Sequence, residues 1–128
     1  MGPRALSPGY SLLELLVVLA IIGLIATVAV PVVTTSVDRM TLAADARAVA
    51  TRLRALREDA LDQQKEIPVA IGTLPVSGGT VVDATPAKDF AIGPDGTMPA
   101  TLRLTRGGAS VRIFANRLTG RFSIEGAR

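Results

Sequence analysis

The sequence predicts an α+β protein in which one long N-terminal helix packs, through its second half, on a C-terminal antiparallel β-sheet. Three observations support this fold class. No charged residue occurs from Leu15 to Val37. Small and apolar residues then recur at helical spacing as far as Ala60. Short β-prone runs separated by Pro and Gly fill the rest of the chain. At 128 residues, the chain has room for a membrane segment and one compact domain.

The uncharged run is long enough to cross a membrane as a helix. Such a helix needs about 20 apolar residues, and Leu15–Val37 provides them. A secretory signal peptide is a poor alternative for two reasons. The apolar region of a signal peptide has only about 7–15 residues, and this run is longer. The run also offers a poor cleavage site, because Pro31 follows the small residues there. A plain signal anchor accounts for the run but gives no role to Glu14 at its N-terminal edge.

Glu14 and Pro31 are unusual residues for a membrane helix. A carboxylate at the centre of such a helix costs about 2.5–3.5 kcal/mol and less near an interface, so Glu14 is expected to have a partner. Pro31 removes a hydrogen-bond donor and is predicted to kink or loosen the helix. Arg4 precedes the run, which favours a cytoplasmic N-terminus and an exported C-terminal domain.

The segment around Glu14 resembles the N-terminus of type IV pilins and type II secretion pseudopilins. The resemblance rests on Gly9-Tyr10-Ser11-Leu12-Leu13-Glu14 followed by the apolar run. It implies that a prepilin peptidase cuts between Gly9 and Tyr10 and that Tyr10, which stands where Phe is usual, is then methylated. It also implies that Glu14 pairs with the N-terminus of the preceding filament subunit. The resemblance also implies that the helix melts locally around Pro31 when subunits pack into a filament.

Beyond the apolar run, the helix is predicted to continue as an amphipathic segment. Its small and apolar positions are spaced by three and four residues: Leu42, Ala46, Val49, Leu53, Leu56 and Ala60. Most charged side chains, including Asp45 and Arg54, are expected to lie off this stripe. The stripe must pack on something, and the sheet is the obvious partner; a dimeric coiled coil is the alternative.

Six short runs after Lys65 are predicted to be strands: Val69–Ile71, Thr80–Asp83, Phe90–Ile92, Thr101–Thr105, Ser110–Phe114 and Arg121–Ile124. In the last three runs apolar residues alternate with polar ones, and Phe122 and Ile124 are the apolar residues of the third. Glycine-containing turns separate these three runs from one another. They predict an antiparallel meander with one buried face. The segment 77–99 is expected to be mostly irregular, with a turn at Pro94-Asp95-Gly96.

These patterns divide the chain into four parts. They are a leader peptide (1–9), a transmembrane and filament-core helix (10–37), an amphipathic helix (38–66) and a C-terminal antiparallel β domain (67–128). The chain has no Cys and no His, which excludes disulfides, thiolate zinc sites and His-dependent nucleophilic catalysis. The acids Asp83, Asp89 and Asp95 lack the spacing of a calcium loop. We therefore expect no enzyme activity, no cofactor and no metal.

The C-terminal part of the chain is basic. From Ala100 onward, six arginines stand against the single acid Glu125, a net charge of +5. Arg103, Arg112 and Arg121 are therefore candidate contacts for an anionic partner. The simpler interpretation is a solvated strand face that is rich in Arg.

A second resemblance concerns the C-terminal half. Phe90-Ala91-Ile92-Gly93-Pro94-Asp95-Gly96-Thr97, the two strands that follow and Thr119-Gly120-Arg121 resemble the C-terminal domain of H-type minor pseudopilins. The resemblance implies a pilin-like fold and a subunit of the type II secretion pseudopilus. Such a subunit sits in the bacterial inner membrane as a single-pass protein and then enters a periplasmic filament that drives export across the outer membrane. The implied partners are other pseudopilins, the prepilin peptidase, the inner-membrane assembly platform and membrane lipid.

The alternative is a minor pilin of a type IV pilus, because FimT- and FimU-type minor pilins share this C-terminal domain. Some FimT-like pilins bind DNA, and a Gly-Arg-x-Arg motif is associated with that activity. Here Gly120-Arg121-Phe122-Ser123 has serine where the second arginine belongs, so nucleic acid is not the expected partner.

Overall fold

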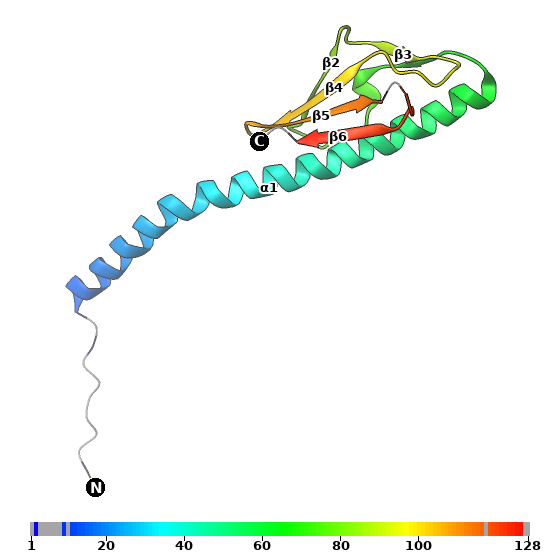
Figure 1. Cartoon of the computed structure of the whole chain (residues 1–128). Helices are drawn as coiled ribbons and strands as arrows, with labels where there is room; N and C mark the ends of the chain where they lie inside the picture. Colours follow the sequence, from blue (N-terminus) through cyan, green and yellow to red (C-terminus); the bar gives the residue numbers. More distant parts are fainter. Residues whose placement is uncertain (1, 3–8, 10, 117, 127–128) are drawn as a thin grey trace. The chain divides into compact units, whose positions relative to one another are not determined.

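The computed structural model describes residues 2, 9, 11–116 and 118–126. One helix is followed by short strands, in the order shown in Figure 1: α1 (Leu12–Gln63), β1 (Ile67–Val69), the 3-10 helix η1 (Ile71–Thr73), β2 (Val81–Thr85), β3 (Phe90–Ile92), β4 (Thr101–Arg106), β5 (Ala109–Ala115) and β6 (Phe122–Gly126). The predicted α+β class is confirmed. The chain divides into two compact units, Met1–Thr34 and Thr35–Arg128, and each is described by itself.

The first unit contains the apolar part of α1. The side chains from Ser11 to Thr34 are all exposed in the isolated chain. By length and composition, α1 is suited to cross a membrane. The helix continues without interruption through Pro31, and the Thr27 hydroxyl donates to the carbonyl oxygen of Leu24 at 2.6 Å. Such back-bonding satisfies a hydroxyl that has no water to bind in a bilayer.

In the second unit, α1 buries one face. The buried residues are Leu42, Asp45, Ala46, Val49, Ala50, Leu53 and Ala60, and Leu56 packs partly buried beside them. The predicted stripe is therefore confirmed. The expectation that Asp45 lies off the stripe is wrong, because Asp45 is only 5% exposed.

The strands form two antiparallel sheets. The larger has the order β2-β4-β5-β6, and the smaller pairs β1 with β3. The meander β4-β5-β6 is the one the sequence predicts, and β2 extends it by pairing with the free edge of β4 over Val81–Thr85. The predicted strands Thr80–Asp83 and Phe90–Ile92 are confirmed as β2 and β3. With these two strands, residues 77–99 are more regular than the mostly irregular segment that was also expected. The turn at Pro94-Asp95-Gly96 is confirmed, since the N–H of Gly96 donates to the carbonyl oxygen of Gly93 at 2.8 Å.

The predicted strand Val69–Ile71 is wrong. β1 ends at Val69, and residues Ile71–Thr73 form the 3-10 helix. The reason is local, because both the backbone N–H and the hydroxyl of Thr73 donate to the carbonyl oxygen of Ala70, at 3.0 and 2.7 Å. These bonds close a turn where an extended strand would have to continue.

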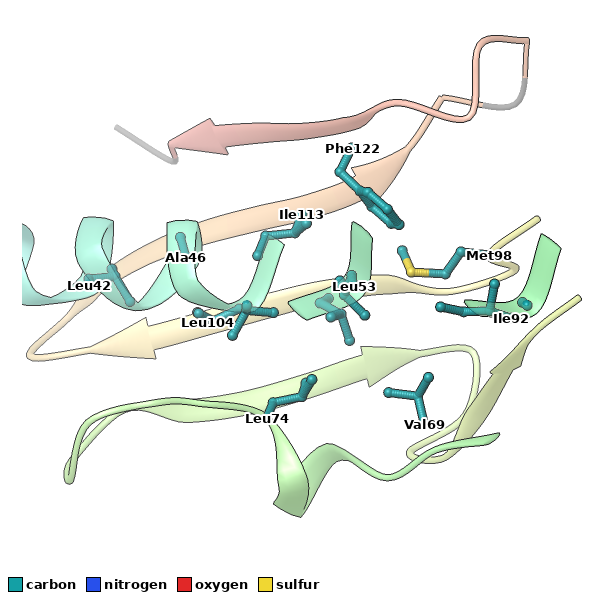
Figure 2. Close-up of a cluster of buried hydrophobic side chains, with 13 residues drawn as sticks. Leu42, Ala46, Leu53, Val69, Leu74, Ile92, Met98, Leu104, Ile113 and Phe122 are labelled. Carbon is teal, nitrogen blue, oxygen red and sulfur yellow. The ribbon is translucent and has the colours of Figure 1, made fainter. Parts of the chain in front are cut away.

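The core lies between α1 and the sheets. Figure 2 shows Leu42, Ala46 and Leu53 of α1 among Leu104 and Ile113 of the larger sheet. The alternation predicted for β4 and β5 is confirmed, because Leu102, Leu104 and Ile113 are fully buried. On β6 the predicted alternation holds only for Phe122, which is buried. Ile124, expected in the core, is 42% exposed and lies on β6, the edge strand of the larger sheet.

Candidate functional site

The start of α1 displays the acid that the sequence singles out. The backbone N–H of Glu14 donates to Oγ of Ser11 at 3.1 Å, so Ser11 caps the helix. Glu14 lies in the first turn and is exposed, where the helix dipole favours a negative charge. Among residues 11–116 and 118–126, the Glu14 carboxylate has no ionic partner. It is therefore free to bind a cation from outside the described chain.

Ser11 is a functional residue that the sequence reasoning missed. Its spacing to Glu14, Ser-x-x-Glu, is that of a capping box, in which the N-cap hydroxyl and the N3 acid support each other. This signal was present in the sequence. It indicates that Glu14 marks the first turn of the helix as well as providing a charge.

The predicted cleavage site lies just before α1. Gly9 is exposed, and a Cβ added to it would meet no heavy atom within 4 Å. Packing within the described chain therefore does not require glycine at this position, and cleavage after Gly9 stays a prediction. Tyr10, the predicted methylation site, and Arg4 lie outside the described residues.

Asp45 holds a loop against α1 in the second unit. Its Oδ1 accepts hydrogen bonds from the backbone N–H and hydroxyl of Ser77, at 3.1 and 2.8 Å, and its Oδ2 accepts one from the Thr80 hydroxyl at 2.6 Å. Burial raises the pKa of Asp45, but these hydrogen bonds and the nearby Arg106 outweigh burial and leave the pKa below its ordinary value of 3.8. The carboxylate is therefore ionised at neutral pH.

Arg106 makes a second polar connection between α1 and the sheet. Its Nε donates to Oδ1 of Asp38 at 3.0 Å, and one terminal nitrogen donates to the carbonyl oxygen of Gly78 at 2.6 Å. Asp38 and Arg106 are 68 residues apart, so sequence spacing gave no signal for this pair. Together, Asp45 and Arg106 fix the loop around Gly78 to the helix.

We expect replacement of Asp45 by Asn to destabilise the second unit by about 1–3 kcal/mol at pH 7, because buried donors lose a charged acceptor. The folded-state pKa lies below the ordinary 3.8. The contribution of the carboxylate is therefore present above about pH 4 and is lost as the pH falls below that value. Urea unfolding of the full-length protein in detergent, followed by circular dichroism, should show the difference from wild type shrinking below pH 4. The exposed control Asp59→Asn should cost little at either pH.

The three predicted anion contacts do not form one patch. The register places Arg103 directly opposite Arg112, with Asp83 and Glu125 at the two ends of the same row across the sheet. Arg112 pairs with Glu125 at 3.4 Å. Two acids therefore balance the two arginines, which lowers the attraction of this row for a polyanion.

Arg121 lies elsewhere, just before β6. It lines a hollow of about 220 Å³ together with Arg54, Arg57, Glu58, Gly120 and Phe122. Arg117 and Arg128, which contribute to the basic count of the C-terminal part, lie outside the described residues.

Arg57 is a second residue that sequence reasoning missed. Its Nε donates to the carbonyl oxygen of Gly96 at 3.2 Å. Its guanidinium also occupies the space where a Cβ on Gly120 would stand, and Gly120 has a positive φ of 64°. Glycine is favoured at Gly120 because of this left-handed backbone, and a side chain there would also have to displace the tip of Arg57.

A model of a known protein family matches the N-terminal part of the chain. Residues 6–30 match the family model of the prokaryotic N-terminal methylation motif. No solved structure matches the chain. Type IV pilin-like proteins with this signal are structural subunits that are processed by a prepilin peptidase and assemble with other pilin subunits. The motif, together with the apolar first part of α1, supports a type IV pilin-like protein and is consistent with single-pass membrane anchoring.

Proposed function

We propose that this chain is an H-type minor pseudopilin of the type II secretion pseudopilus, near the tip of the filament. The observation that carries the proposal is the acid in the first turn of α1, Glu14, placed after Gly9 inside the matched motif. The α+β architecture of the chain is compatible with it. In this role the protein is anchored in the inner membrane, with a cytoplasmic N-terminus and a periplasmic second unit, before it enters the filament.

Cleavage after Gly9 gives Glu14 a chemical partner. The cut releases an α-amine at Tyr10, which is cationic near neutral pH, and methylation keeps that charge. An unpaired carboxylate is penalised in the bilayer. A pair between Glu14 of one subunit and the amine of the preceding subunit removes that penalty, and Coulomb attraction is strong where little water screens it. The pair therefore drives entry into the filament and sets the axial register, with the assembly platform adding subunits from the membrane.

The type IV pilus alternative uses the same leader and helix chemistry. DNA binding by Arg103, Arg112 and Arg121 is not the role that we propose, because Asp83 and Glu125 balance the first two arginines. If DNA were the partner, affinity would fall steeply with salt in proportion to the phosphates contacted.

Deletion of the gene in its own bacterium separates the two filaments. We expect the deletion strain to lose secretion of type II substrates, and we expect a plasmid copy to restore it. Pilus-dependent motility, measured in the same strains, should be unchanged. Normal secretion together with lost motility would instead assign the chain to a type IV pilus.

A further inference from the structure

A hollow of about 730 Å³ lies at one end of the larger sheet. Figure 1 shows the turn between β4 and β5 and the end of β6 at this end of the sheet. From α1 the hollow is lined by Thr35, Arg39 and Leu42, and from the β4–β5 hairpin by Gly107, Gly108 and Ser110. All of these residues belong to the second unit. We call this feature the hairpin hollow.

Two hydrogen-bond donors that line the hairpin hollow are unused. Within the part of the chain that the structure describes, the exposed guanidinium of Arg39 forms no ion pair and no hydrogen bond. The hydroxyl of the half-buried Ser110 also has no partner among those residues. Gly107 and Gly108 carry no side chains, and a Cβ added to Gly108 would meet no heavy atom within 4 Å. The hollow is therefore open at the turn and lined by a cation and a neutral donor.

The acids nearest to the hairpin hollow already have partners. Asp38, which precedes Arg39 in the sequence, binds Nε of Arg106 at 3.0 Å. Glu125 at the end of β6 pairs with Arg112 at 3.4 Å. Each acid is thus balanced by an arginine other than Arg39. The charge of Arg39 therefore remains available, and the hollow attracts an anion.

The place of the hairpin hollow along α1 puts it at a membrane surface. Thr35 belongs to the uncharged run that is suited to cross a membrane, and Arg39 is the first cation after that run. These two residues are about 6 Å apart along the helix. Headgroups occupy about 5–7 Å on each side of a bilayer, and arginine side chains reach toward them. A helix that crosses with its uncharged run in the hydrocarbon therefore places this hollow beside the headgroups.

We propose that the hairpin hollow binds the headgroup of an anionic phospholipid, with the lipid phosphate on Arg39 and the Ser110 hydroxyl. The inference rests on the proposed membrane anchoring and names a lipid contact of the subunit before it enters the filament. A phosphate diester has one negative charge and several acceptor oxygens, which match these two donors. A dissolved phosphate has the same chemistry, but a lipid is held beside the hollow at a high effective concentration. The lipid is therefore the occupant.

A fluorescent label beside the hairpin hollow tests the proposal. The chain has no Cys, so Gly126→Cys creates a single labelling site. Gly126 lines the hollow, and a Cβ there would meet no heavy atom within 4 Å. The labelled full-length chain would be placed in phosphatidylcholine nanodiscs that contain a rising fraction of phosphatidylglycerol. We expect the emission of an environment-sensitive label to change with this fraction and then to level off, which gives a midpoint.

Substitutions in the labelled chain identify the donors. Arg39→Gln should raise the midpoint at least about tenfold, as expected for loss of a hydrogen bond between charged groups. Arg39→Lys keeps a cation that binds phosphate and should restore most of the response. Ser110→Ala should raise the midpoint about threefold, as for a neutral hydrogen bond.

Arg47→Gln is the matched control for Arg39→Gln. Arg47 is also an exposed arginine on α1, but it lies outside the hairpin hollow and ~12 Å further along the helix. Its replacement should leave the midpoint unchanged. Circular dichroism should show wild-type unfolding for both variants, because neither arginine has an ion pair among the described residues.

Three results would overturn the inference. Equal effects of Arg39→Gln and Arg47→Gln would show only a general attraction to an anionic surface. A full response to inorganic phosphate in pure phosphatidylcholine nanodiscs would assign the hollow to a dissolved anion. Normal insertion into nanodiscs without any response to phosphatidylglycerol would reject the headgroup site and leave the proposed function standing. Failure of the full-length chain to insert would remove the proposed membrane anchoring as well.

Discussion

Replacement of Glu14 by Ala is expected to leave cleavage after Gly9 intact and to reduce incorporation into the filament by at least about tenfold. An unpaired acid costs about 2.5–3.5 kcal/mol at the centre of a bilayer and less near its edge, where Glu14 lies. Removing the acid removes this drive toward pairing, and about 1.4 kcal/mol already corresponds to a tenfold change. Alanine itself is well tolerated in the helix. The measurement is the fraction of the protein recovered in sheared filaments relative to the membrane, by immunoblotting.

Two controls isolate the charge of Glu14. Glu14→Asp keeps a carboxylate in the first turn and should retain a substantial part of the incorporation. Glu58→Ala removes an exposed acid beyond the uncharged run and should leave filament entry near the wild-type level. Normal incorporation of Glu14→Ala would contradict the pairing.

Replacement of Gly120 by Ala is expected to destabilise the second unit by about 2–4 kcal/mol. The left-handed backbone at φ 64° costs a residue with a Cβ about 1–2 kcal/mol. The new methyl group would also displace the Arg57 guanidinium and disturb its hydrogen bond to Gly96, and loss of that charged hydrogen bond adds about 1–2 kcal/mol. Urea unfolding of the full-length protein in detergent, followed by circular dichroism, measures the sum.

Gly108 offers a matched control for the contact with Arg57. It also has a positive φ, 82°, but a Cβ there would meet nothing within 4 Å. Gly108→Ala should therefore show the backbone cost alone, about 1–2 kcal/mol. If the two variants lost the same stability, the contact between Gly120 and Arg57 would contribute nothing.

Local patterns predicted the elements whose causes are local. The spacing from Leu42 to Ala60 predicted the buried face of α1, and alternation in β4 and β5 predicted which residues face the core. The burial of Asp45 was not predictable in this way, because its partners Ser77 and Thr80 lie 32 and 35 residues away. The turn after β1 was missed because alternation of residue types gives no sign of the two hydrogen bonds from Thr73 to Ala70 that close it.

The residues of the candidate site can also be separated into those that a local pattern predicted and those that it did not. A contiguous motif predicted Gly9 and Glu14, and the structure leaves both exposed. The basic count of the C-terminal part groups Arg103, Arg112 and Arg121 as candidate anion contacts, and that role stays a prediction. A count along the chain ignores strand register, which brings Asp83, from the earlier part of the chain, opposite Arg103.

The intact mass and N-terminal residue of the membrane-extracted protein, measured with and without prepilin peptidase, test the central claim most directly. With the peptidase present, we expect a chain that begins at Tyr10 and carries one N-terminal methyl group. Without the peptidase, we expect neither change. A chain that keeps Met1 in the presence of the peptidase would contradict the filament role and leave a membrane-anchored β domain.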